Sequence, residues 1–176
     1  MNKDVKAGTL VFKPRARLIK TIGEELISDD KVAIIELVKN SYDAYSSLYN
    51  GDPIVDIVFQ GNVETCTDTS GSRKYIISKK GASIIIYDEG VGMDFNTIEH
   101  AWMEPATNFK KLKENQDPQK KYSGEKGIGR FASAKLASKL ELVTRREGED
   151  EIVVFFDWNM FSNEEDYLDD VKINWQ

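Results

Sequence analysis

Three clusters of polar and glycine residues in this 176-residue chain have a spacing that could support chemistry. The first is the stretch ELVKNSYDA at 36–44. On a helix, Asn40 lies about 40° and Asp43 about 20° from Glu36, so the three side chains share a stripe about 60° wide. An amide oxygen can ligate Mg²⁺, and a carboxylate can take a proton from water. The stripe therefore suits a hydrated metal and phosphate site, although it would also suit an ordinary solvent-facing helix.

The second cluster is IIIYDEGVGM at 84–93, in which an apolar strand delivers Asp88 into a turn with Gly90 and Gly92. Glycine lets the backbone approach a ligand closely. A carboxylate at this position can accept a hydrogen bond from an exocyclic amine. The same residues also fit a plain turn at the end of a strand.

The third cluster is GEKGIGRF at 124–131, directly before a segment with a helical pattern. Free N–H groups and the helix dipole make such a loop a ready anion site. A P-loop is excluded because Arg130 and Phe131 follow Gly129, where a Lys and a Ser or Thr are needed. A Rossmann fingerprint is excluded because the order is GxxGxG, late in the chain. A flexible loop before a helix remains the alternative.

The elements that must position these clusters follow from periodicity and turn residues. We expect helices at 15–27, 31–49, 95–103 and 132–140. We expect strands at 54–59, 75–78, 83–88, 141–146 and 151–158. Leu18, Ile22 and Leu26 would form the apolar face of the first helix, and Ser28, Asp29 and Asp30 offer caps for the second. Residues 60–73 read as a loop. Hairpins are expected around Lys80-Gly81 and around 147–150, which gives an α+β sandwich.

Composition excludes several classes of protein. The chain has 24 basic and 30 acidic side chains, a net charge of −6, which disfavours a dedicated nucleic-acid binder. Cys66 is the single cysteine and His100 the single histidine, so an intramolecular disulfide and a Cys/His zinc site are excluded. No apolar run is long enough to span a membrane, and no signal peptide is visible. We expect one cytoplasmic domain with no membrane contact.

Together, ELVKNSYDA, DEGVGM and GEKGIGRFA resemble the three sequence boxes of the GHKL ATPase superfamily, in the same order and spacing. That superfamily contains gyrase, heat-shock chaperone ATPases, histidine kinases and MutL. The resemblance covers about Ala16 to Trp158, and Trp102 with Thr107-Asn-Phe-Lys110 looks most similar to MORC-type and related prokaryotic members. It implies an α+β fold of the Bergerat type, a two-layer α/β sandwich. Helices would cover one face of a mixed, mostly antiparallel sheet, with a mobile ATP lid at about 103–129.

The resemblance also implies a role for each matching residue. Glu36 resembles the general base that activates water, and Asn40 the ligand of Mg²⁺. Asp88 resembles the carboxylate that binds the adenine amino group. The nucleotide-binding set implied in this way is Asn40, Asp43, Ala44, Asp88, Gly90, Gly92, Met93, Thr107, Lys110, Gly124, Lys126, Gly127, Ile128 and Gly129. Within it, Gly124, Gly127 and Gly129 would present amides to the β- and γ-phosphates.

The implied function is Mg²⁺-dependent binding of ATP and slow hydrolysis to ADP and phosphate. Hydrolysis would drive lid closure and dimerisation of a larger clamp-like protein. Residues 1–176 would form a single domain, the N-terminal fragment of that protein, whose missing domains complete the active site and could contact nucleic acid. Thr144 looks too early for the late-strand threonine that many members place near adenine. Two alternatives are open: a sensor histidine kinase catalytic domain, for which no upstream phospho-acceptor histidine exists, and a non-hydrolysing adenine-nucleotide-binding interaction module.

Overall fold

The computed structural model describes residues 9–45, 51–61, 63–67, 70, 73–77, 81–105, 107, 122, 127 and 129–176. Most of the expected lid at 103–129 therefore lies outside the described residues. The helical elements are α1 (Arg17–Glu25), α2 (Asp30–Asp43), α3 (Phe95–Thr97), the π-helix η1 (Ile98–Trp102), the 3₁₀ turn η2 (Gly129–Ala132), α5 (Ser133–Leu136), and the 3₁₀ turns η3 (Trp158–Ser162) and η4 (Leu168–Asp170). Among these helices, none is both long and apolar enough to cross a membrane.

Helix α2, which carries the first cluster, begins as the sequence predicts and ends earlier. The Asp29 carboxylate accepts a hydrogen bond from the Val32 N–H at 3.0 Å, so Asp29 is the N-cap. The predicted end at residue 49 is wrong, because the helix stops at Asp43. At that point the Ala44 carbonyl accepts a hydrogen bond from the Val91 N–H at 2.9 Å, which draws the chain toward the second cluster.

The helix predicted at 132–140 is also shorter in the structure. It consists of η2 and α5 and ends at Leu136, where Ala137 is already extended, with φ −148° and ψ 156°. Strand β5 (Lys139–Thr144) starts two residues later. The pairing of Lys139 and Leu140 with Asp157 and Phe156 overrides their helical pattern, because β-strand hydrogen bonds form there instead.

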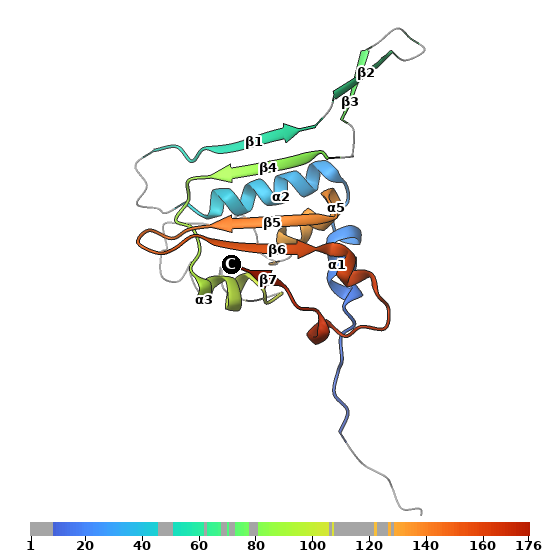
Figure 1. Cartoon of the computed structure of the whole chain (residues 1–176), viewed down its shortest axis with the longest axis vertical. Coiled ribbons are helices and arrows are strands. Elements are labelled where there is room, and N and C mark those ends of the chain that lie inside the picture. Colours follow the sequence, from blue (N-terminus) through green and yellow to red (C-terminus); the bar gives the residue numbers. More distant parts are fainter. Residues whose placement is uncertain are drawn as a thin grey trace, which may run out of the picture.

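The strands are β1 (Val55–Gln60), β2 (Val63–Thr67), β3 (Arg73–Ile77), β4 (Ser83–Asp88), β5 (Lys139–Thr144), β6 (Ile152–Asp157) and β7 (Asn174–Trp175). They form three antiparallel sheets, β1-β4, β2-β3 and β5-β6-β7. The predicted hairpin of β5 and β6 is confirmed. The predicted hairpin around Lys80-Gly81 is wrong, since β4 pairs with β1 instead. The loop predicted at 60–73 is wrong for residues 63–67, which pair with β3 to form a two-stranded ribbon that projects from the body (Figure 1).

The α+β fold class is confirmed, with helices α1, α2 and α5 packed together on one side of the strands (Figure 1). Strands β4 and β5 run in the same direction, but no ladder of backbone hydrogen bonds joins them. The sheets β1-β4 and β5-β6-β7 therefore meet edge to edge at β4 and β5 without pairing (Figure 1).

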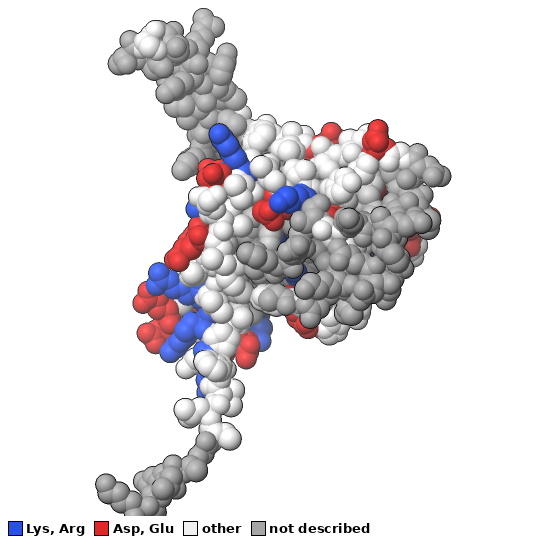
Figure 2. All heavy atoms as spheres, turned by 180° about the vertical axis from the view of Figure 1, so that it is seen from behind, with Lys and Arg blue, Asp and Glu red and all other residues white. Residues whose placement is uncertain are grey.

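The main core lies between α1, η1, η2 and strand β6. Its largest fully buried side chain is Trp158, which stacks on Phe156 with ring centroids 5.3 Å apart. The predicted apolar face of α1 is confirmed at Ile22, which packs against the core, and wrong at Leu18 and Leu26, which are exposed while Ile19 and Gly23 are buried. Packing decides the face: a Cβ on Gly23 would lie 2.4 Å from the Phe131 carbonyl oxygen, so this glycine allows α1 to approach η2. The opposite face of α1 is charged, and Arg17 forms an ion pair with Glu164 at 2.7 Å (Figure 2).

Candidate functional site

The first and second clusters meet where α2 ends. A Cβ built on Gly90 would lie 2.5 Å from the Ala44 Cβ and 2.9 Å from the Ala44 carbonyl oxygen. No side chain fits in that space, so a glycine at position 90 is required for this contact. Together with the hydrogen bond from Val91 N–H to the Ala44 carbonyl, the contact fixes the DEG turn on the end of α2.

The hydroxyl of Tyr45 also stabilises the contact between the end of α2 and the turn of the second cluster. Its oxygen donates to the Ile54 carbonyl at 2.5 Å and accepts from the Ile54 and Glu89 N–H groups, each at 3.2 Å. The side chain is buried, so these bonds replace those that the hydroxyl would make with water. The tyrosine thereby joins the end of the first cluster to the start of β1 and to the turn of the second cluster.

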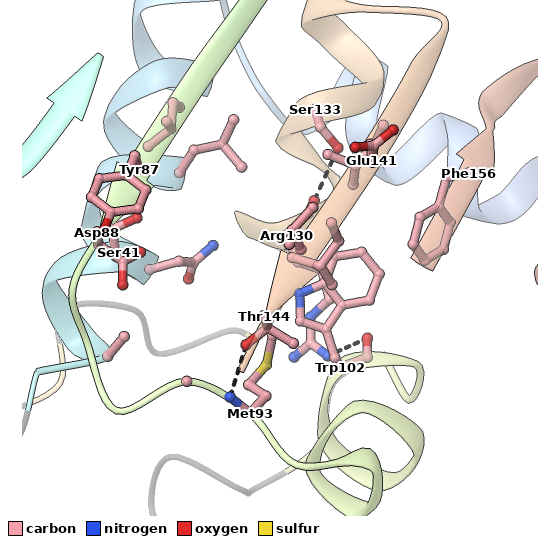
Figure 3. Close-up of a pocket in the computed structure, with 18 of the residues that line it drawn as sticks. Ser41, Tyr87, Asp88, Met93, Trp102, Arg130, Ser133, Glu141, Thr144 and Phe156 are labelled. Carbon is pink, nitrogen blue, oxygen red and sulfur yellow. Dashed lines mark hydrogen bonds between the residues drawn. The ribbon is translucent and has the colours of Figure 1, made fainter. Parts of the chain in front are cut away.

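The turn of the second cluster continues against the end of β5. Gly92 has a φ of +67°, and a Cβ there would lie 2.0 Å from the Arg145 carbonyl oxygen. The next residue, Met93, donates its N–H to the Thr144 hydroxyl at 2.9 Å, and both residues lie in the cavity wall (Figure 3). Thr144 looks too early in the sequence for a place near the site, yet this strand brings it beside the turn.

Asp94, directly after this turn, begins α3. Its carboxylate accepts a hydrogen bond from the Thr97 N–H at 2.7 Å and pairs with the Arg146 guanidinium. The hydrogen bonds from Thr97, and then the charge of Arg146, hold the pKa of Asp94 below its usual value. This ion pair ties the turn to the segment that follows β5.

The third cluster lies on the first. A Cβ on Gly129 would lie 2.8 Å from the Glu36 Oε2 and 3.8 Å from the Asn40 Nδ2. The other carboxylate oxygen of Glu36 accepts an ion-paired hydrogen bond from Lys39 Nζ at 2.8 Å. Glu36 is outside the lining of the cavity described below, and its side chain is 24% exposed.

The central cavity has a volume of about 1850 Å³ and lies between α2, β4, β5 and η2. Figure 3 shows Asp88 and Ser41 on one wall, with Arg130 and Trp102 on the other and Thr144 and Met93 near its lower end. One part of the cavity is lined by residues of the three clusters, and the remainder extends along strands β4 and β5. The predicted site residues in its wall are Asn40, Asp43, Ala44, Asp88, Gly90, Gly92, Met93, Thr107 and Gly127.

The polar stripe of α2 is not a solvent-facing stripe. Asp43 is only 7% exposed, and Asn40 is half-buried in the cavity wall. The cavity therefore receives an amide and a carboxylate from one helix, as the helical spacing predicts.

Two polar groups in the wall have hydrogen-bonding capacity to offer a ligand. The Asp88 Oδ1 accepts the Gly90 N–H at 2.9 Å, and within the part of the chain that the structure describes the carboxylate has no further partner. The Thr107 hydroxyl is buried and has no hydrogen-bond partner among the described residues. A carboxylate that can still accept and an unpartnered hydroxyl in one cavity wall favour a polar ligand.

No group of three or more His, Cys, Asp or Glu side chains among the described residues could hold a metal ion by itself. Mg²⁺ commonly takes only one or two protein ligands when it also binds substrate phosphates. The Asn40 amide fits that chemistry, since it is in the cavity wall beside Glu36 and Gly129.

The predicted residues Lys110, Gly124, Lys126 and Ile128 lie outside the described residues. The sequence reasoning missed Tyr45 and Arg130, which the structure brings to the site, and set Thr144 aside as too early in the chain although it lies in the cavity wall. Arg130 stands inside the third cluster, so its position was a signal that could have been used. The pattern around Tyr45 indicates only an apolar helix side, and its polar role depends on contacts with distant residues.

The fold and the site together define an ATPase-like domain: an α+β sandwich in which a polar helix, a strand-end aspartate and a glycine loop surround one cavity. The chain matches the family of histidine kinase-, DNA gyrase B- and HSP90-like ATPases over residues 27–174. It belongs to this family, which confirms the predicted GHKL superfamily. The similarity to MORC-type members stays a prediction.

The chain is similar to chaperone protein HtpG from several bacteria. The HtpG of Geobacter metallireducens is 30% identical over 142 residues, which is 76% of this chain and 21% of the chaperone. The HtpG of Ruthia magnifica is 29% identical over 141 residues, with the same coverage, and that of Geobacter sulfurreducens is 28% identical over 142 residues. The chain spans about a fifth of the length of these relatives.

Proposed function

We propose that this domain binds ATP with Mg²⁺ in the central cavity and hydrolyses it to ADP and phosphate. The observation that carries the proposal is the meeting of all three clusters at one cavity: Gly90 lies on Ala44, and Gly129 lies on Glu36 and Asn40. Membership of the ATPase family supports the same activity.

The adenine end of the cavity is assigned to Asp88. Its carboxylate is held by the Gly90 N–H and retains acceptor capacity, which suits the exocyclic amine of adenine and not the carbonyl oxygen of guanine. Met93 and Gly92 lie in the adjacent wall, where an apolar side chain and bare backbone leave room for a flat base.

The phosphate end is assigned to Asn40, Gly127 and Gly129, with Glu36 as the general base. Phosphoryl transfer to water depends on positioning and charge neutralisation more than on covalent chemistry. Bound Mg²⁺ would neutralise phosphate charge at Asn40, and glycine amides would donate to the phosphate oxygens. Gly129 lies against the Glu36 carboxylate, so the proposed base and the proposed phosphate-binding turn would be neighbours.

The binding test is calorimetric titration of the chain with ADP, ATP and GTP, each with and without Mg²⁺. We expect adenine-selective binding that Mg²⁺ strengthens for ATP. Asp88→Asn should weaken ADP binding about 10- to 100-fold, the equivalent of one charge-assisted hydrogen bond. Asp56→Asn, an exposed residue of β1 outside the cavity wall, is the matched control and should bind as the wild type does. Equal ADP affinity in the wild type and Asp88→Asn would refute the assignment of the adenine end.

The catalytic test separates binding from turnover. Glu36→Ala should retain ATP binding within about threefold and lose phosphate release, because the residue contributes a base and not a nucleotide contact. If Glu36→Ala releases phosphate at the wild-type rate in a protein that binds ATP, Glu36 is not the base.

We further propose that ATP binding promotes self-association through the N-terminal arm, residues 9–14. Leu10 and Phe12 are fully exposed, Val11 nearly so, and the arm runs away from the body (Figures 1 and 2). Three adjacent exposed apolar side chains mark an interaction site, which we assign to a second copy of this chain. Sedimentation velocity should show an ATP-dependent dimer that Phe12→Ser abolishes, whereas an ATP-bound monomer in the wild type would contradict this step. Contact with nucleic acid has no support among the relatives and is not part of the proposal.

A further inference from the structure

Arg130, in the third cluster, binds the end of the π-helix η1 with its guanidinium. Its Nη1 donates to the Ala101 carbonyl and to the Trp102 carbonyl at 2.6 Å, while the Glu104 carbonyl lies at 3.5 Å, the outer limit of a hydrogen bond (Figure 3). The carbonyls at the end of a helix have no partners within the helix, and they form its negative end. A cationic donor at this point satisfies them.

The surroundings of Arg130 make this contact unusual. The side chain is half-buried in the cavity wall, and among the described residues it forms no ion pair with a carboxylate. Burial lowers the pKa of Arg130 from its ordinary value, so the environment resists the charge that the carbonyls stabilise. Because its guanidinium is bonded to these carbonyls, Arg130 contributes little to the charge of the surface. Its role is to hold the backbone at the end of η1.

The neighbours of Arg130 fix its backbone on both sides. Gly129 lies on the Glu36 carboxylate, and the buried Phe131 lies against Gly23 of α1 and packs edge-on to Trp158 with centroids 6.4 Å apart. Three consecutive residues of η2 therefore contact α2, η1 and α1 respectively. A single turn therefore joins these three contacts.

We propose that Arg130 is a positioning residue that locks the end of η1 to the glycine turn at the phosphate end of the cavity. The lock holds Ala101 and Trp102 in the cavity wall and keeps Gly129 over Glu36. This deepens the proposed ATPase function and rests on it for its consequence, which is that the lock discriminates ATP from ADP. The affinity for ADP would depend mainly on the contacts at Asp88. Binding of the γ-phosphate of ATP would also require the glycine turn to be held in its position.

The first arm of the test measures the lock without nucleotide, by hydrogen exchange followed by NMR. The Met103 N–H is bonded to the Ile98 carbonyl at 2.8 Å at the end of η1 and serves as the reporter. In Arg130→Met we expect it to exchange at least tenfold faster, while the Val153 N–H, bonded to the Gln176 carbonyl at 2.8 Å, stays within twofold. Arg17→Met, which loses only the surface pair with Glu164, is the matched control. An unchanged Met103 rate in Arg130→Met would overturn the lock.

The second arm measures the affinities for ADP and for a non-hydrolysable ATP analogue. In Arg130→Met we expect at least tenfold weaker binding of the analogue and a change of less than threefold for ADP. Equal losses for both nucleotides indicate a general structural role and overturn the positioning role, as do no losses. If Arg130→Met does not fold, Arg130→Lys shortens the reach of the side chain and should give both effects with at least threefold amplitude. If the wild type binds neither nucleotide, the proposed function fails while the exchange arm still decides the lock.

Discussion

At Gly92 the structure leaves no room for a side chain and the backbone is left-handed, which makes Gly92→Ala a sharp test of the site geometry. Two penalties act there. The φ of +67° is left-handed, and a Cβ would lie 2.0 Å from the Arg145 carbonyl oxygen and 2.6 Å from its carbon. Both neighbours are backbone atoms, so the β5 end or the turn has to move.

Gly148 supplies a control that separates the two penalties. Its φ is +81°, but a Cβ there would meet nothing within 4 Å. Gly148→Ala should therefore carry only the backbone penalty, about 1–2 kcal/mol. Gly92→Ala should carry the same penalty plus about 1–3 kcal/mol for overpacking. The difference between the two variants isolates the contact between the turn of the second cluster and β5.

Urea unfolding followed by circular dichroism measures this difference. With a slope of about 2 kcal/mol per molar urea, Gly92→Ala should unfold at about 0.5–1.5 M less urea than Gly148→Ala. ADP affinity should fall in Gly92→Ala, because the displaced turn carries Met93 away from Thr144, and should be unchanged in Gly148→Ala. Equal urea midpoints for the two variants would refute the close approach of Gly92 to Arg145.

Two further predictions concern the residues around this turn. Tyr45→Phe should destabilise the fold by about 1–3 kcal/mol, because it leaves the Ile54 carbonyl and the Ile54 and Glu89 N–H groups without their shared partner. Urea midpoints would check this against Tyr42→Phe on the exposed side of α2, and equal effects would contradict the role given to Tyr45. The pKa of Asp94 is lowered in the folded state, so its contribution to stability is present above about pH 4 and is lost as pH falls through the folded-state pKa. Melting temperatures between pH 7 and 3 should therefore fall less steeply for Asp94→Asn than for the wild type, and superimposable pH profiles would contradict it.

The parts of the fold that the sequence predicts well are those with strong local signals. The cap at Asp29, the start of α2 and the hairpin of β5 and β6 depend on neighbouring residues and are confirmed. Helical spacing also predicts that Asn40 and Asp43 lie on one side of α2, and both are in the cavity wall, whereas only the family resemblance brings Asp88 to the same site. Their roles toward a nucleotide stay predictions.

The errors occur where distant contacts decide the structure. Residues 63–67 look like loop in isolation and form a strand because β3 pairs with them. The buried face of α1 is set by Gly23, whose lack of a side chain lets the Phe131 backbone approach, and a pattern of large apolar residues cannot reveal such a face. Tyr45 and Thr144 join the site through hydrogen bonds to residues 44 and 51 positions away, respectively.

Each of three glycines in the second and third clusters allows two elements of the site to come into close contact, in addition to its proposed role toward the ligand. Gly90 lies on Ala44, Gly92 on Arg145 and Gly129 on Glu36, so each glycine joins two elements that carry the site. A methyl group at Gly90 or Gly92 would meet backbone atoms and push two elements apart before it touched a ligand, whereas at Gly129 it would meet the end of the Glu36 side chain, which can move. Loss of nucleotide binding in a glycine variant is therefore informative only beside a stability measurement. Gly148→Ala, which has open space and a left-handed φ, provides the reference for that comparison.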